Sequence, residues 1–199
     1  MGLLNEKNRL PKSKNDESTY RADILNAITK VVDSGWYIQG EEVRNFEHEF
    51  ASFIGSKYCV GVANGLDALS ITLKAWILLG KIKEGDEVIV PANTFIATVL
   101  AITQNHLKPI FVEPDEETFN INVDMIRNVI TEKTKVIIPV HLYGQVAEMN
   151  KIRELADLHD LLILEDSAQA HGAMYNNLKA GTLVMQALLV STQVKTWGH

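Results

Sequence analysis

Two adjacent carboxylates, Glu165 and Asp166, follow an apolar run in the segment LLILEDSAQAHG, residues 161–172. The run has the length of a buried strand, so at least one carboxylate is expected near the apolar interior, where a charge is costly unless it meets a cation. A carboxylate paired with a pyridinium nitrogen keeps that nitrogen protonated and makes the ring an electron sink, as in pyridoxal phosphate chemistry. Alternatively, Asp166 caps a helix or binds a metal with His171, although no third clustered ligand is evident.

A second candidate site is the turn ANGLDAL, residues 63–69, between a predicted strand and a predicted helix. Gly65 lies at this turn, where the unpaired N–H groups of a helix N-terminus can bind an anion such as a phosphate. Alternatively, the glycine serves only to turn the chain. The sequence contains neither a G-x-x-x-x-G-K-[ST] motif nor a G-x-G-x-x-G motif, which argues against a P-loop and against a dinucleotide-binding fold.

Two ring-bearing residues also follow predicted strands. Phe95 lies in the segment PANTF, residues 91–95, and an aromatic residue there can stack on a flat ligand ring. The alternative is that Phe95 is a core residue. His141 ends an apolar run, and it can act as a ligand or as an acid–base group, but we favour a structural histidine with satisfied hydrogen bonds.

Alternating helical and strand periodicities predict the elements that position these residues. Helices are expected at 17–33, 41–53 (ended by Gly55), 67–79, 94–104, 123–130 (opened by Asn122) and 151–159, and strands at 58–62, 87–90, 109–112, 135–141 and 161–166. The strands are continuous apolar runs, which indicates burial on both faces and hence an α/β fold with a mainly parallel sheet flanked by helices. In such sheets, ligands bind outside the carboxyl ends of the strands.

The composition is that of a soluble globular protein, with 46% hydrophobic and 22% charged residues and a net charge of −6. No basic face indicates nucleic-acid binding, and the apolar runs are too short to span a membrane. The polar segment 1–16 lacks a signal-peptide core, so a cytoplasmic location is expected. Cys59 is the single cysteine, which excludes an internal disulfide, and we expect it to be a small buried residue in a strand.

Together these motifs resemble the DegT/StrS family of pyridoxal 5'-phosphate-dependent sugar-nucleotide aminotransferases. The matching segments are SGWYIQG (34–40), VGVANGLDAL (60–69), GDEVIVPANTF (85–95), PVHLYG (139–144) and EDSAQAHG (165–172). The resemblance runs from about residue 20 to residue 183 and covers roughly the N-terminal half of a full-length family member. It implies the type I aspartate-aminotransferase fold, with an incomplete large domain at 17–183, an aberrant tail at 184–199, and the C-terminal small domain missing.

The resemblance also implies roles for individual residues. Gly65 and Leu66 correspond to the backbone clamp on the cofactor phosphate, Phe95 to the stacking ring, Asp166 to the pyridinium partner, Gln169 to the residue near the phenolic oxygen, and Trp36 with Tyr37 to part of the sugar-nucleotide site. The implied reaction transfers an amino group from glutamate to a keto-sugar nucleotide, here a dTDP-linked 3- or 4-keto-6-deoxyhexose for O-antigen or other cell-surface polysaccharides. Family active sites lie at a homodimer interface, so a homodimer is expected for the full-length protein.

The family carries its Schiff-base lysine in a segment close to GDAAGFSFYPGKNLGA. This sequence follows the family through KAGTL, residues 179–183, and then reads VMQALLVSTQVKTWGH, residues 184–199. Back-translated and read one base earlier, these codons can encode GDA[S/G][A/S]FSFYPGKNLGA. We therefore expect a one-base frameshift, by mutation or sequencing error, in a gene for a longer enzyme, and resequencing should find an intact downstream frame.

Lys195 falls at the position of the Schiff-base lysine. The family's Phe-Tyr-Pro-Gly before that lysine is replaced by STQV, residues 191–194. One alternative is therefore a catalytically inactive, truncated remnant that at most binds pyridoxal phosphate. A further alternative is an α/β domain that binds an unrelated phosphorylated ligand without chemistry.

Overall fold

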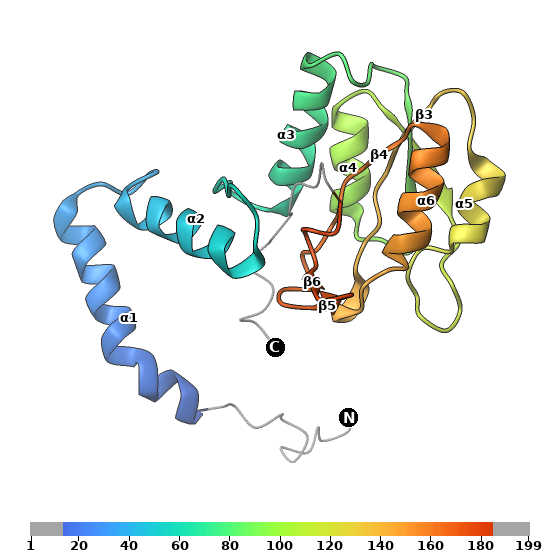
Figure 1. Ribbon diagram of the computed structural model, residues 1–199. Helices are drawn as coiled ribbons and strands as arrows, with labels where there is room; N and C mark the ends of the chain where they lie inside the picture. The colour runs from blue at the N-terminus through green and yellow to red at the C-terminus, as the bar shows by residue number, and fades with distance from the viewer. Residues whose placement is uncertain (1–13, 185–199) are drawn as a thin grey trace, which may run out of the picture. The chain divides into compact units, whose positions relative to one another are not determined.

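The computed structural model describes residues 14–184, with side chains from residue 20 onward (Figure 1). The chain forms two compact units, one up to Glu47 and one from His48. The elements are α1 (Lys14–Ser34), α2 (Glu41–Ile54), α3 (Gly65–Leu78), β1 (Glu87–Pro91), α4 (Ile96–Gln104), β2 (Lys108–Val112), α5 (Val123–Val129), β3 (Thr134–Ile137), the 3-10 turn η2 (Leu142–Gly144), α6 (Met149–His159), β4 (Leu162–Ile163), β5 (Met174–Tyr175) and β6 (Leu178–Lys179).

The second unit is built on a four-stranded sheet with the order β2-β1-β3-β4. All of its strands are parallel: Ile89 of β1 pairs with Ile110 of β2 and with Ile137 of β3, and Ile137 pairs with Ile163 of β4. The predicted α/β class with a parallel sheet is therefore confirmed. A parallel bridge between Val140 and Asp166 continues the β3–β4 pairing beyond the regular strands.

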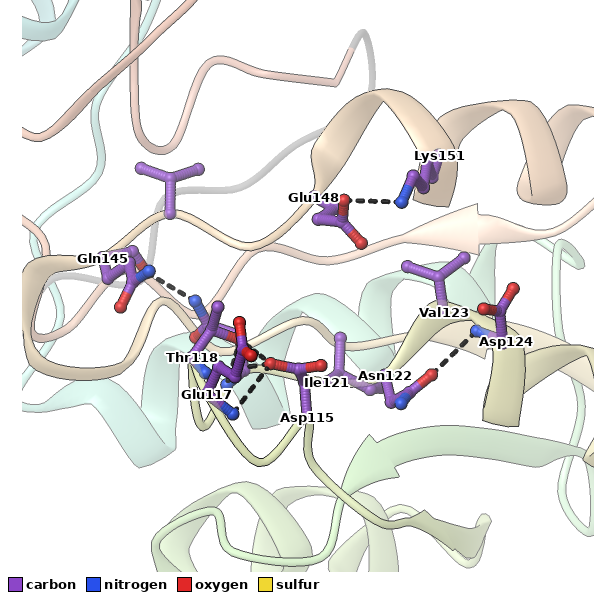
Figure 2. A pocket seen from close by; sticks show the side chains of 12 residues that line it. Asp115, Glu117, Thr118, Ile121, Asn122, Val123, Asp124, Gln145, Glu148 and Lys151 are labelled. Carbon is purple, nitrogen blue, oxygen red and sulfur yellow. Dashed lines mark hydrogen bonds and ion pairs between the residues drawn. The ribbon is translucent and has the colours of Figure 1, made fainter.

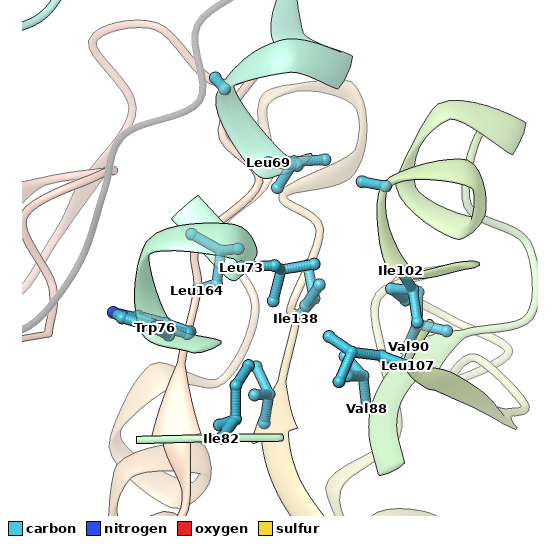
Figure 3. Packing of buried hydrophobic residues seen from close by; sticks show 13 residues of the cluster. Leu69, Leu73, Trp76, Ile82, Val88, Val90, Ile102, Leu107, Ile138 and Leu164 are labelled. Atoms are coloured by element: carbon cyan, nitrogen blue, oxygen red, sulfur yellow. The ribbon is translucent and has the colours of Figure 1, made fainter. Parts of the chain in front are cut away.

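Successive strand residues face two separate hydrophobic clusters. On one face the strand residues Val88, Val90, Val136 and Ile138 pack with α3 and α4, as Figure 3 shows for Leu73 and its neighbours. On the other face Ile89, Ile137 and Ile163 pack with α5 and α6. The helices lie in these two layers in Figure 1. Both faces of the sheet are covered, which is why the strands read as continuous apolar runs.

Side-chain caps fix the beginnings of two helices: Asn122 caps α5 as the sequence predicts, and Asn64 caps α3, which begins at Gly65 rather than at the predicted Asp67. The Asn64 side chain accepts a hydrogen bond from Asp67 N at the start of α3. The Asn122 side chain accepts from Asp124 N and Met125 N at the start of α5. Each cap satisfies amides that lack an intrahelical partner. Gly55 follows α2 with φ +86°, a left-handed conformation typical of a helix C-terminus.

The predicted strand at 58–62 is wrong, because these residues form no strand and pair with no other described residue in a sheet. Tyr58 and Val60 are 75% and 72% exposed, so the segment is not a buried strand of the sheet. Cys59 is accordingly half-buried and outside any strand, contrary to the sequence-based expectation. An apolar run becomes a strand only where neighbouring strands offer backbone partners.

The other predicted strands exist, but two of them are shorter than expected. The run at 135–141 is regular only through Ile137, and the run at 161–166 only at Leu162–Ile163. Beyond these points the backbone still bonds across the pair, with Leu164 N donating to Ile137 O and Asp166 N to Pro139 O. Within residues 14–184, no helix combines the length and the apolar character that crossing a membrane requires.

The amino end of the sheet holds a buried carboxylate, Glu87, which is 5% exposed. It accepts hydrogen bonds from Thr131 Oγ1 at 2.6 Å and Lys108 Nζ at 3.0 Å. The Thr131 bond, followed by the Lys108 bond, lowers the pKa of Glu87 from its ordinary value of 4.5. A depressed folded-state pKa means that this stabilisation is present above the unfolded value and is lost as the pH falls through the folded one.

We therefore expect the free energy of unfolding to depend less steeply on pH in Glu87→Gln than in the unaltered chain when the pH is acidic. Urea unfolding between pH ~3 and pH ~7 should show a smaller stability loss on acidification for the variant than for the unaltered chain. Glu84→Gln is the matched control, because Glu84 is exposed three residues earlier. Parallel acid profiles for the Glu87 variant and the unaltered chain would contradict the assignment.

Candidate functional site

The adjacent carboxylates Glu165 and Asp166 are both buried after β4, with 0% and 7% exposure. Successive residues in an extended chain point to opposite faces. Accordingly Leu164 belongs to the cluster under α3 and α4, whereas Ile163 belongs to the cluster under α5 and α6. Asp166 contacts α4, because its Oδ2 accepts from Thr98 Oγ1 at 3.1 Å. The side chains of Glu165 and Asp166 therefore lie on different sides of the sheet.

The Asp166 carboxylate is held in a defined orientation. Its Oδ1 accepts from Ala168 N at 3.2 Å, and its Oδ2 from Thr98, which is itself 1% exposed. The Thr98 hydroxyl lies 2.9 Å from that of Thr94. Among the described residues, no three potential metal ligands cluster. The arrangement presents one oriented, weakly solvated carboxylate at the carboxyl end of a parallel strand.

Phe95 is the N-cap residue of α4, one turn before Thr98, whose amide donates to Phe95 O at 3.1 Å. Its side chain makes no cap hydrogen bond and is 56% exposed. The alternative that Phe95 is a core residue is therefore wrong. The ring lies on the helix turn that also supplies the hydrogen bond to Asp166.

The amino terminus of α3 offers backbone donors. The Asn64 oxygens accept from Asp67 N and Ala68 N. The amides of Gly65 and Leu66, the first two of the helix, donate to no other residue in the described part of the chain. These amides and the positive end of the helix dipole favour an anion.

Amide side chains connect the loops that follow the four strands. Asn93 Nδ2 donates to Phe119 O at 2.9 Å, joining the loops after β1 and β2. Asn120, which is 4% exposed, joins the loops after β2 and β3, because it donates to Gln145 O and accepts from Leu142 N. Neither Asn93 nor Asn120 was singled out from the sequence. Asn93 directly follows the apolar run that forms β1, which was an available signal, whereas Asn120 lies late in the loop between β2 and α5, where no such signal marks it.

Gln169 completes this series after β4. Its Oε1 accepts from Tyr143 N at 2.9 Å, and the residue is exposed. Tyr143 has φ 54°, a left-handed conformation within the turn η2. Because the oxygen of Gln169 is engaged by the backbone, its amide NH2 is the group left to donate to a ligand.

His141 is fully buried, and its ring nitrogens face Glu165 Oε2 at 3.2 Å and Ala147 N at 3.3 Å. The interpretation of His141 as a structural histidine is confirmed by these contacts. His171 packs edge-on against Phe50, with ring centroids 6.3 Å apart, and burial lowers the pKa of its imidazole.

A groove of about 410 Å³ lies on the α5/α6 side of the molecule (Figure 2). Hydrogen bonds from the backbone and hydroxyl of Thr118 lower the pKa of Asp115 there. The Glu148 carboxylate, 2.7 Å from Lys151, raises the pKa of that lysine. None of the residues predicted to bind a cofactor lines this groove. The Asp115 carboxylate is used in a turn, and that of Glu148 in a surface ion pair with Lys151.

Trp36 and Tyr37 lie in the first unit, after α1, with 56% and 66% exposure. Trp36 Nε1 donates to Ile38 O at 2.8 Å, and the Arg44 guanidinium carbon lies 5.1 Å from the Trp36 ring centroid. The Trp36 ring is thus held by neighbouring residues of the first unit. The role of Trp36 and Tyr37 in sugar-nucleotide binding stays a prediction. Lys195 lies outside the described residues, as does the tail from residue 185.

Comparison with known proteins gives consistent matches. A model of the DegT/DnrJ/EryC1/StrS aminotransferase family matches residues 18–191 and so extends past Leu183, where the motif resemblance ended. The dTDP-3-amino-3,6-dideoxy-alpha-D-galactopyranose transaminase of Aneurinibacillus thermoaerophilus is 51% identical over 164 residues, which are 82% of this chain and 44% of that protein. The dTDP-3-amino-3,4,6-trideoxy-alpha-D-glucose transaminase of Streptomyces venezuelae is 45% identical over 161 residues, 81% of this chain and 41% of that protein.

Solved structures match in the same way. The structure of S. venezuelae DesV in complex with a ketimine intermediate superposes with a TM-score of 0.81 at 42% identity, over 88% of this chain and 46% of that one. The E. coli GDP-4-keto-6-deoxy-D-mannose-3-dehydratase with bound hydrated PLP gives a TM-score of 0.75 at 34% identity, over 79% and 41%. The chain therefore spans less than half the length of the relatives that it matches.

Proposed function

The chain belongs to the DegT/DnrJ/EryC1/StrS aminotransferase family, and from this premise we propose that it acts in the pyridoxal-phosphate-dependent amination of a keto-sugar nucleotide. The proposed substrate is a dTDP-linked 3-keto-6-deoxyhexose, and the proposed donor is glutamate. Of the 3-keto and 4-keto sugars that the sequence left open, we favour the former, because the two relatives described above are named for 3-amino sugars. We further propose a cytoplasmic homodimer that supplies cell-surface polysaccharide synthesis.

The donor set of the described residues fits the cofactor. Pyridoxal phosphate, when bound, supplies an electron sink for amino transfer. Asp166 would hold the proton on the ring nitrogen, and the Thr98 hydroxyl orients its carboxylate. The amides of Gly65 and Leu66 would bind the phosphate, and the exposed ring of Phe95 would stack on the pyridine. The Gln169 amide would donate to the phenolic oxygen.

The observation that carries this proposal is the buried, oriented carboxylate of Asp166. A carboxylate that is 7% exposed is costly as an anion unless it meets donors or a cation. Thr98 and Ala168 supply two neutral donors. A pyridinium N–H would add a charged donor, and charge-assisted bonds are roughly twice as strong as neutral ones.

A second candidate is cofactor binding without turnover. The groups proposed to hold the cofactor lie within the described residues. The lysine that the reaction needs is assigned by resemblance to Lys195, outside those residues, where the four preceding residues differ from the family pattern. The second candidate function uses the same cofactor-binding residues as the first. It differs in that no lysine forms a covalent bond with the cofactor.

A cofactor titration distinguishes the two candidates. Adding pyridoxal phosphate to the chain, followed by borohydride and peptide mapping, should give a visible absorbance band and a lysine-linked adduct at Lys195 if the chain catalyses amino transfer. Saturable binding without a fixed adduct supports the second candidate. No binding, or binding equal to that of pyridoxal without its phosphate, overturns both. Turnover of 3-keto and 4-keto dTDP-sugars with glutamate, followed by mass spectrometry, then tests the substrate.

A further inference from the structure

Glu165 is a fully buried carboxylate that the proposed cofactor chemistry does not use. Three donors converge on it: Gly181 N reaches Oε2 at 2.7 Å, Leu183 N reaches Oε1 at 2.8 Å, and His141 Nε2 lies 3.2 Å from Oε2. Both oxygens of the carboxylate are thus engaged, and two of the three donors belong to the backbone of a segment 16 and 18 residues further along the chain.

The histidine contact has a defined polarity. His141 Nδ1 accepts from Ala147 N at 3.3 Å, so that nitrogen carries no proton. The ring proton is then on Nε2, which donates to Glu165. This assignment makes Glu165 the acceptor of three N–H groups, a role that an ionised carboxylate fills and a carboxamide fills only in part.

The segment that Glu165 holds is secured on its other side as well. The Leu183 carbonyl accepts from Arg153 Nη1 of α6 at 3.3 Å, and the Leu183 side chain, 3% exposed, belongs to the cluster under α5 and α6. Ala180 N donates to Ala173 O at 2.9 Å. Residues 180–183 are therefore held by backbone hydrogen bonds and by the buried side chains of Ala180 and Leu183.

We propose that Glu165 is a positioning residue, which ties residues 181–183 to the end of β4 and so holds the neighbouring Asp166 in the orientation that the cofactor requires. The proposal rests on the proposed function for its link to the cofactor. Glu165 and Asp166 are consecutive, and Asp166 bonds to Thr98 of α4, whereas Glu165 bonds to Leu183, whose side chain lies in the cluster under α5 and α6. The Asp166 backbone also bonds to the segment after β3, with Asp166 N donating to Pro139 O and His141 N donating to Asp166 O. The Glu165 contacts therefore hold the same strand end from the α5/α6 side of the sheet.

The test compares Glu165→Gln with the unaltered chain. A carboxamide offers one oxygen and one NH2, so whichever way it turns, either Leu183 N or Gly181 N faces a donor. Hydrogen exchange at Gly181 and Leu183 should become roughly tenfold faster or more relative to the sheet amides. The Kd for pyridoxal phosphate should rise by about the same factor, although Glu165 is fully buried and its three partners are none of the groups proposed to hold the cofactor.

Glu87→Gln is the matched control, because Glu87 is also a buried carboxylate, 5% exposed, at the opposite end of the sheet. It should change neither the exchange at Gly181 and Leu183 nor the Kd. Unchanged hydrogen exchange at Gly181 and Leu183 in Glu165→Gln overturns the proposal. Faster exchange with an unchanged Kd for pyridoxal phosphate also overturns it, because Glu165 then has only a structural role. If the unaltered chain does not bind the cofactor, both the proposed function and the proposed link between Glu165 and Asp166 are wrong. The hydrogen-exchange comparison then still tests whether Glu165 holds residues 181–183 in place.

Discussion

Replacing Asp166 with Asn is expected to weaken pyridoxal phosphate binding by about 30-fold to several thousand-fold. The reason is that truncating one partner of a buried, hydrogen-bonded charge pair costs about 2–5 kcal/mol. An Asn can keep the Thr98 contact through its carbonyl oxygen. It cannot offer a negative charge to a protonated ring nitrogen. Titration followed by cofactor absorbance measures the effect.

The controls for this prediction distinguish a loss of the Asp166 contact with the cofactor from unfolding of the variant. Glu87→Gln removes the charge of another buried carboxylate, at the amino end of the sheet, and should leave cofactor binding unchanged. Unfolding of the Asp166 variant in urea should remain cooperative. An Asp166→Asn variant that binds the cofactor as tightly as the unaltered chain would exclude Asp166 as the ring partner.

Replacing Leu73 with Ala is expected to lower the free energy of unfolding by about 2–5 kcal/mol. Leu73 lies on α3 with 0% exposure, in the cluster with Ile138 and Leu164 that Figure 3 shows. The substitution removes apolar contacts and leaves a cavity that the surrounding layer fills only in part. This is a large share of the total stability of a domain, which is about 5–15 kcal/mol. Urea unfolding measures it.

The matched control for Leu73 lies on the same helix. Ile71 is 55% exposed, so Ile71→Ala should change the free energy of unfolding by about 0.5 kcal/mol or less. Both substitutions shorten a branched aliphatic side chain in α3 to the same residue, so helix propensity contributes little to the difference. Equal losses for the two variants would contradict the assignment of Leu73 to the core.

Local sequence patterns predicted most of the elements correctly. The helix bounds at α2, α3 and α6 fall within two residues of the predicted ones, because apolar spacing acts within one or two turns. Asn122 opens α5 as predicted, whereas the Asn64 cap of α3 was not predicted. The parallel sheet followed from strands that are apolar on both faces. The strand at 58–62 failed because strand formation also requires a partner, which is not a local property.

The residue types that follow each strand can be read from the amino-acid order alone, and they indicate the kind of chemistry expected at the carboxyl edge of the sheet. How Glu165 and Asp166 divide their roles became visible only in the folded chain. Asp166 meets Thr98, 68 residues away, and Glu165 meets Leu183, 18 residues away. Neither contact leaves a periodic signal, because each depends on how the layers on the two faces of the sheet pack. The physical reason is that hydrophobic periodicity reports the burial of a side chain, whereas the partner of a buried polar group is chosen by the fold as a whole.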